Sequence, residues 1–158
     1  MKILMMIAII AAGAGVASAR LGENITQCDQ RYNSTGGNIS KDFIDNHSKL
    51  ITGINTTNVV YIYDGWKIKI GYMNSYAVVI EYKRLDGGRI DNTQLGMILR
   101  VNCGDQTWAP NGMFNWTGSR GAGLYNDGHR VRLESPAYKQ FNDSKQGQRQ
   151  APSPGLNL

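Results

Sequence analysis

The sequence predicts an α+β fold, in which an antiparallel β meander carries two short amphipathic helices packed on one face. Residues 59–84 hold three runs of alternating apolar and polar residues, and Asp64-Gly65 separates the first two. Asp-Gly between such runs is typical of a type I′ hairpin, whose two central residues both need positive φ. Apolar residues at helical spacing occur before these runs and again after them.

The two-residue turn sets the register of the first hairpin. Pairing Tyr63 with Trp66 places Lys67 and Lys69 on one face and the apolar residues on the other. The apolar face then consists of Val59, Tyr61, Tyr63, Trp66, Ile68, Ile70 and Tyr72. The next strand covers residues 76–84. Keeping its alternating residues on the Trp66 face requires a three-residue loop at 73–75 or a bulge; these residues are Tyr76, Val78, Ile80 and Tyr82.

The first helix is expected over residues 23–32. Leu21, Ile25, Cys28 and Tyr32 recur at helical spacing, and Asn24 with a glutamine three residues later resembles a capping box. Residues 33–57 are rich in Asn, Ser, Thr and Gly, which favour turns. Within that stretch, a helix of about three turns after Ser40 is an alternative.

The second helix is expected over residues 91–102, with Asp91 and Gln94 as a capping box and Gly104 at its end. Residues 105–111 read as a loop around Trp108, in which Pro110 excludes a central strand. Further strands are expected at 113–116, 122–126 and 129–134, followed by a helical turn at 136–141.

Asp127-Gly128 repeats the hairpin signal of Asp64-Gly65 at an offset of 63 residues. Two interpretations remain open. Either the chain contains a tandem repeat of helix followed by strands, or two hairpins of one domain use the same favoured turn.

Composition divides the chain into three parts. Residues 1–19 resemble a signal peptide, with Lys2, an apolar run and the Ala17-Ser18-Ala19 cleavage pattern. Residues 20–142 fit a single α+β domain. Residues 143–158 hold almost no apolar side chains, which predicts a disordered C-terminal tail. We therefore expect a secreted or periplasmic protein with no membrane span after cleavage.

Cys28 and Cys103 are the two cysteines of the chain. An oxidising compartment favours a disulfide between them, and the alternative is two buried, unpaired thiols.

Residues 22–32 read Gly-Glu-Asn-Ile-Thr-Gln-Cys-Asp-Gln-Arg-Tyr. This stretch resembles the start of a group of small, exported, uncharacterised bacterial proteins known from Verrucomicrobia, which open with Gly-Glu-Thr-x-x-Gln-Cys-x-x-Arg-Tyr-Gly. The resemblance continues to about residue 140, through Asn102, Trp108, Trp116 and the Asp127-Gly128 hairpin. It transfers no site residue, because the group has no assigned activity. The architecture resembles more distantly the SmpA/OmlA-type lipoproteins and the β-lactamase-inhibitor-protein fold, which bind other proteins.

The sequence carries no motif of catalysis. Cys103 and His129, with a nearby Asp, are the candidates for a small hydrolase-like enzyme, but no motif surrounds Cys103. Two histidines and two cysteines lack metal-ligand spacing, so neither a metal site nor a cofactor is expected.

Two surfaces are candidates for binding. Lys67, Lys69, Arg130 and Arg132 alternate with apolar residues and form a basic face if both hairpins join one sheet, although such alternation is also typical of an ordinary solvated face. Trp108 is expected to be partly exposed in its loop. Cleavage after residue 19 leaves a net charge of +4, which is too mild for a dedicated nucleic-acid binder. The sequence thus predicts an exported, non-catalytic domain that binds a partner protein or envelope component.

Overall fold

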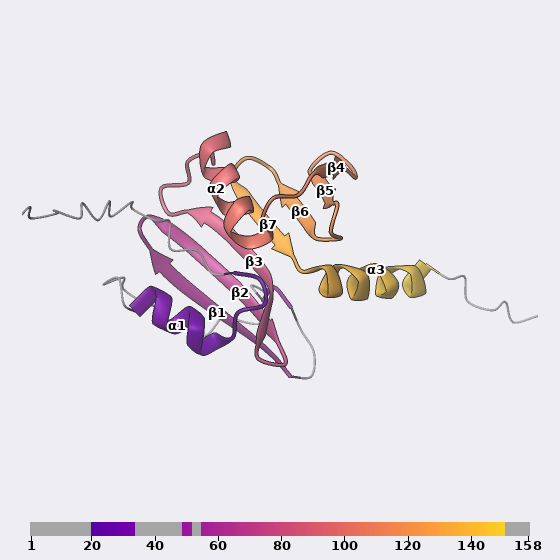
Figure 1. The fold of residues 1–158 in the computed structure, drawn as a ribbon, viewed down its shortest axis with the longest axis horizontal. Helices are drawn as coiled ribbons and strands as arrows, with labels where there is room; N and C mark the ends of the chain where they lie inside the picture. The colour runs from indigo at the N-terminus through magenta and orange to yellow at the C-terminus, as the bar shows by residue number, and fades with distance from the viewer. Residues whose placement is uncertain (1–19, 34–48, 52–54, 151–158) are drawn as a thin grey trace, which may run out of the picture.

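A computed structural model of the chain describes residues 20–33, 49–51 and 55–150. Within these residues, three helices and a seven-stranded antiparallel sheet confirm the predicted α+β class (Figure 1). In chain order the elements are α1 (Ile25–Asn33), β1 (Thr56–Tyr63), β2 (Trp66–Met73), β3 (Tyr76–Arg84), α2 (Asn92–Cys103), β4 (Trp108–Pro110), β5 (Asn115–Gly118), β6 (Gly123–Asn126), β7 (Arg130–Glu134) and α3 (Pro136–Gln150).

The sheet consists of two meanders that meet at their last strands. The strand order is β1-β2-β3-β7-β6-β5-β4, so β3 of the first meander pairs with β7 of the second (Figure 1). Each meander follows a helix, which agrees with the order expected for a repeat of helix and strands. Ile80 lies opposite Leu133 and Tyr82 opposite Val131, so the apolar sides of the two meanders form one continuous surface.

The two turns expected to be equivalent differ in structure. Asp64 and Gly65 both have positive φ, 45° and 78°, and Tyr63 pairs with Trp66 as predicted. In the second hairpin Asn126 pairs with Val131, and the Asp127 carboxylate accepts the N–H groups of His129 and Arg130 at 3.0 and 2.8 Å. Gly128 and His129 are therefore the central residues, so the expected Asp127-Gly128 turn is wrong by one position. The reason is that the Asp127 side chain binds the backbone two and three residues ahead.

A β-bulge in β3 corrects the predicted alternation of that strand. Met73 pairs with Tyr76 around a tight Asn74-Ser75 turn, and the register shifts opposite Gly71 and Tyr72. The bulge was one of the two expected solutions. It lies at Val78, however, so of the four predicted residues Ile80 and Tyr82 share the Trp66 face, and before the bulge Ala77 takes that place opposite Tyr72.

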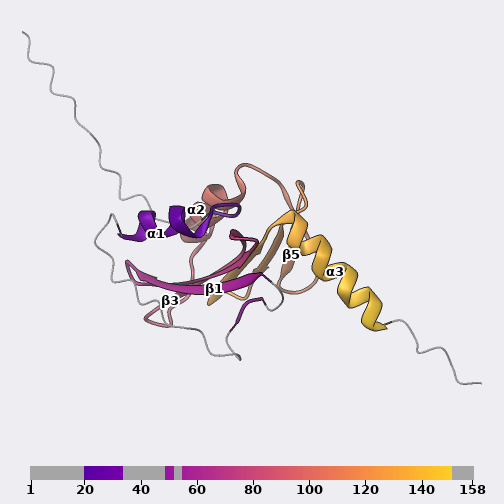
Figure 2. The ribbon, with the colours of Figure 1, turned by 90° about the horizontal axis from the view of Figure 1, so that it is seen from below.

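Both α1 and α2 pack on the same face of the sheet, as predicted (Figure 2). Each begins with the predicted capping box: Asn24 and Gln27 exchange two hydrogen bonds of 2.9 Å, and Asp91 and Gln94 exchange bonds of 2.8 and 3.1 Å. The core between helices and sheet contains Cys28, Tyr32, Val59, Tyr61, Ile68, Ile70, Tyr72, Ala77, Ile80, Tyr82, Ile90, Ile98, Leu124, Val131 and Leu133.

The opposite face carries a smaller apolar cluster at one end. Ile51, Val78, Val79 and Tyr138 are buried there, and Ile51 lies directly over Gly71. A Cβ atom on residue 71 would approach Ile51 Cγ1 to 2.9 Å, so the glycine is needed for this close contact. The cluster joins segment 49–51 and the start of α3 to the sheet.

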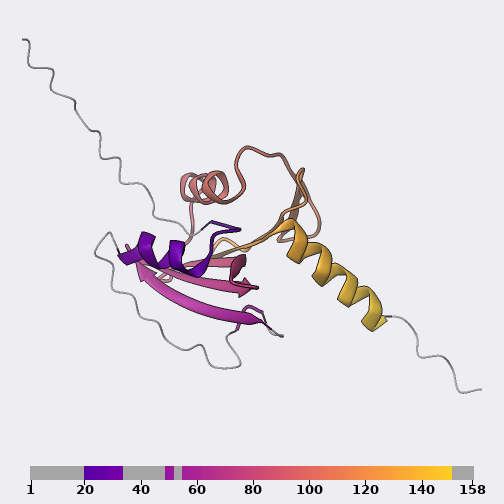
Figure 3. The same cartoon turned by 60° about the horizontal axis from the view of Figure 1, so that its bottom comes forward.

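Helix α3 is longer than the expected turn at 136–141. It continues through Asp143 to Gln150, where the sequence predicted a tail, and projects away from the sheet (Figure 3). Residues 151–158 and the predicted signal peptide, 1–19, lie outside the described residues. Most of the helix considered after Ser40 also lies outside the described residues. Residues 49–51, at the end of that stretch, are not helical.

The predicted loop around Trp108 contains the short edge strand β4, which ends at Pro110. Its position at the edge agrees with the exclusion of proline from a central strand.

Candidate functional site

Both cysteines are free thiols, so the predicted Cys28–Cys103 disulfide is wrong and the alternative of two unpaired thiols holds. Cys28 lies on the side of α1 that faces the sheet, and its Sγ atom is 3.7 Å from Glu23 Oε2. Cys103 is the last residue of α2 and is half-buried. Burial raises the pKa of each thiol to about 11. Both are therefore protonated at neutral pH and are weak nucleophiles.

Cys103 and His129 do not come together. The Ile90 N–H donates to the Gly128 carbonyl at 2.7 Å, which places the β6–β7 turn beside the start of α2. Cys103 lies at the other end of this twelve-residue helix, about 18 Å along its axis. His129 instead has its Nδ1 atom 3.2 Å from the Gly87 carbonyl oxygen. A nucleophile and base need hydrogen-bond contact, and this pair lacks it.

Alkylation of the unreduced protein checks the state of the thiols. We expect two alkylated cysteines after denaturation without reductant. In the folded protein, Cys103 labelling with iodoacetamide should be slow at about pH 8 and rise about tenfold per pH unit, because only about one thiol in a thousand is then ionised. A species that resists alkylation until it is reduced would contradict this prediction.

No group of three His, Cys, Asp or Glu side chains in the described part of the chain is placed to hold a metal ion. Within the same residues, no helix is long and apolar enough to cross a membrane.

The four predicted cations lie on one face of the sheet, opposite the helices. Lys67 pairs with Lys83 on β3, and Lys83 pairs with Arg130 on β7. In the next row Lys69 pairs with Glu81, and Glu81 pairs with Arg132. Directly opposed residues share a face, because side chains alternate along each strand. We call this side of β2, β3, β6 and β7 the charged face, and Lys67, Lys83 and Arg130 the cation row.

Carboxylates balance much of this charge. Glu81 lies 3.8 Å from Lys69 and 3.9 Å from Arg130, and Arg132 donates to Glu134 at 2.8 Å. For Lys67 and Lys83 the described residues provide no ion pair. Arg130 also lies 3.5 Å from Asp127, so the unbalanced positive charge of the cation row is concentrated at Lys67 and Lys83. Lys83 was not among the cations predicted from the sequence.

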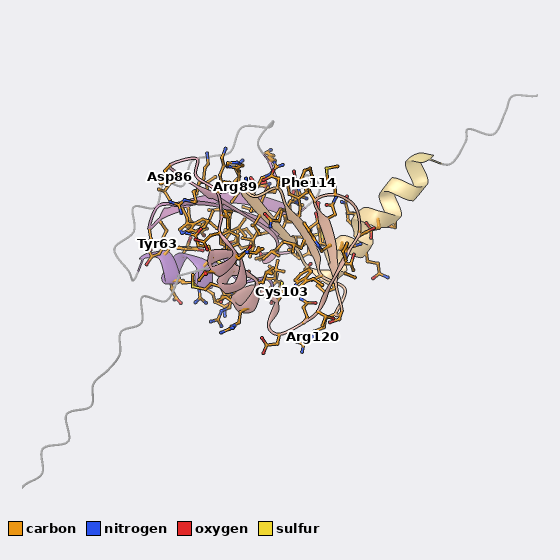
Figure 4. All side chains as sticks on the ribbon, turned by 90° about the horizontal axis from the view of Figure 1, so that it is seen from above. Tyr63, Asp86, Arg89, Cys103, Phe114 and Arg120 are labelled. Carbon is orange, nitrogen blue, oxygen red and sulfur yellow. The ribbon has the colours of Figure 1, made fainter. Side chains whose placement is uncertain are left out.

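An aromatic pair extends the charged face beyond Arg130. The Arg130 guanidinium lies 4.8 Å from the centre of the Tyr125 ring and donates to the Tyr125 hydroxyl at 3.1 Å. The Phe114 ring makes an edge contact with the Tyr125 ring, and the two ring centres are 6.2 Å apart. Phe114 lies across the sheet from Cys103 and Arg120 (Figure 4). Next to it, Met113 is 82% exposed.

A hollow of about 480 Å³ adjoins Arg130 on this face. Polar groups dominate its lining, which comes from β3, β5, β6, β7 and the first turns of α3. The lining residues are Glu81, Asn111, Asn115, Trp116, Gly123, Leu124, Tyr125, Arg130, Arg132, Glu134, Lys139, Asn142 and Asp143. The hollow was not predicted from the sequence, because its lining residues are spread between Glu81 and Asp143 and follow no local motif.

Trp108 does not belong to the charged face. It is half-buried and packs against the core on the helix side of the sheet, as does Trp116 through its side chain. A second hollow, of about 410 Å³, lies on that side between α2 and the β1–β2 turn. Trp66, Leu85, Met97 and Ile98 contribute its apolar lining.

Comparison of the chain with protein-family profiles, with curated proteins and with solved structures finds no match. The resemblance to exported bacterial proteins therefore stays a prediction, and function has to be argued from the geometry.

Proposed function

We propose that the chain is an exported, non-catalytic domain that binds a partner protein or envelope component through its charged face. The observation that carries this proposal is the difference between the two faces of the sheet. Two helices cover one face, whereas the other presents Lys83 and Arg130 to solvent beside a polar hollow. Exposed cations, an aromatic edge and a concave surface are typical of binding sites.

The environment of the cysteines argues against the hydrolase-like alternative. A catalytic thiol needs a lowered pKa and a base within hydrogen-bond reach. Burial raises the pKa of both thiols, and Cys103 is separated from His129 by the length of α2.

Co-sedimentation of the purified chain with the insoluble envelope fraction of its host tests the proposal. We expect the wild-type chain to pellet with the envelope, and Lys83→Gln with Arg130→Gln to reduce the pelleted fraction at least fivefold. The matched control carries Arg100→Gln and Arg120→Gln, which remove the same charge from exposed positions away from the charged face. Equal retention of the two double variants, or no retention of the wild-type chain, would refute the proposed surface.

A further inference from the structure

Resting on the proposed function, we infer that the ligand of the charged face is an acidic polysaccharide. Its acid groups bind the cation row, and the hydroxyl groups of a neighbouring sugar bind in the hollow. Arg130 belongs to both parts, so the two subsites are continuous.

The cation row supplies the charge selectivity. Lys67, Lys83 and Arg130 are direct cross-strand neighbours on three adjacent strands. Strands lie about 4.8 Å apart, so three cations fall within about 10 Å. Like charges directly opposite each other destabilise a sheet. Acid groups spaced along a polymer relieve this repulsion, and one or two sugar units of an acidic chain span such a distance.

The hollow supplies groups that recognise hydroxyls. Amides of Asn111, Asn115 and Asn142 offer both donors and acceptors, and the carboxylates of Glu81 and Glu134 offer acceptors. Among the residues that the structure describes, the Arg132 Nε atom is buried without a hydrogen-bond partner. A buried donor without a partner is costly, and the rest of the Arg132 side chain lines the hollow, where its guanidinium can donate to a ligand oxygen.

The same residues disfavour other anionic partners. Single-stranded nucleic acids are bound by stacking bases on open aromatic rings, whereas Arg130 and Phe114 already contact the Tyr125 ring. A protein partner needs apolar pockets for its anchoring side chains. Of the thirteen residues that line the hollow, Trp116, Leu124 and Tyr125 are hydrophobic, and the side chains of Trp116 and Leu124 pack in the core on the helix side.

Binding of defined polymers tests the inference with the full chain. The probes are heparin and polygalacturonate as acidic polysaccharides, dextran as a neutral one, polyglutamate as an acidic polypeptide and oligo-dT as a nucleic acid. Isothermal titration calorimetry at about 50 and 150 mM salt measures each affinity. We expect heparin or polygalacturonate to bind at least tenfold more tightly than polyglutamate and oligo-dT, and dextran to bind least.

Two sets of variants separate the subsites. Lys67→Gln with Lys83→Gln should weaken binding of the acidic polysaccharide at least tenfold, while Arg100→Gln with Arg120→Gln leaves it within twofold. Asn115→Ala with Asn142→Ala should weaken polysaccharide binding at least threefold and leave polyglutamate binding unchanged. The Tm of every variant, followed by circular dichroism, confirms that it is folded.

Three results would overturn the inference. If polyglutamate or oligo-dT binds as tightly as the polysaccharides, the inference is wrong, and the proposed binding function stands with another ligand. Unchanged polysaccharide affinity in the folded Lys67 and Lys83 variant would remove the cation row from the site. Absence of binding to both acidic polysaccharides would end the inference, while envelope co-sedimentation still decides the proposed function separately.

Discussion

Replacing Tyr61 by alanine is expected to lower the free energy of unfolding by about 4 kcal/mol, because it removes a large aromatic side chain from a closed core. Tyr61 is fully buried on β1, and its ring stacks on Tyr32 of α1 with centres 4.5 Å apart. Its hydroxyl donates to Asp29 Oδ1 at 2.7 Å. One side chain thus provides both the packing and the polar contact that hold α1 on the sheet.

The variant Tyr61→Phe separates the two contributions. It keeps the ring, so we expect a loss of about 1 kcal/mol from the missing hydrogen bond. Urea denaturation followed by circular dichroism measures both values. The control is Tyr76→Ala, at a tyrosine that is 56% exposed, and its loss should stay within about 0.5 kcal/mol. A similar loss for Tyr61→Ala and Tyr76→Ala would contradict the docking of α1 described here.

The second large effect is expected at Glu81, where Glu81→Gln should lower the free energy of unfolding by about 2 kcal/mol. The Glu81 side chain is 11% exposed and lies between Lys69 and Arg130. Arg132 is its direct partner on β7. Removing the carboxylate leaves Lys69 without its counter-ion and leaves Arg130 with Asp127 alone, and breaking a largely buried ion pair is strongly destabilising.

Lys83→Gln is the matched control, two residues along the same strand. It removes a charge that faces Lys67 and Arg130, so stability should stay constant or rise by a few tenths of a kcal/mol. Urea denaturation at about 50 mM salt gives both values, since screening weakens them at higher salt. Equal destabilisation by the two substitutions would show that charge balance does not organise this face.

Local signals predicted the elements themselves well. The capping boxes at Asn24 and Asp91 located the starts of α1 and α2, because an N-cap hydrogen bond depends on residues three positions apart. Asp64-Gly65 located the first turn and its register for the same reason. The turn at Gly128-His129 was not predicted, since the Asp127 side chain binds the backbone N–H groups of His129 and Arg130 and the central residues lie one position further along.

The candidate site was predictable only in part. Alternation along β2 and β7 placed Lys67, Lys69, Arg130 and Arg132 away from the core, and their shared face follows from pairing through β3. The sequence could not show that Glu81 neutralises Lys69 whereas Lys83 joins the row, because these contacts depend on which strands are neighbours. Trp108 is partly exposed as predicted, but it lies on β4, and its side chain packs against the core on the helix side of the sheet.

The amino-acid sequence alone determined the class of fold, both capped helices, the first hairpin and the apolar side of the sheet, because each depends on residues a few positions apart. Tertiary structure alone decided that β3 and β7 are neighbours, that Cys28 and Cys103 remain separate thiols, and that the hollow and the cation row share Arg130. Those features depend on contacts between residues that are dozens of positions apart. Many sequences with the same local pattern can satisfy such contacts in different ways, so only the packed chain specifies them.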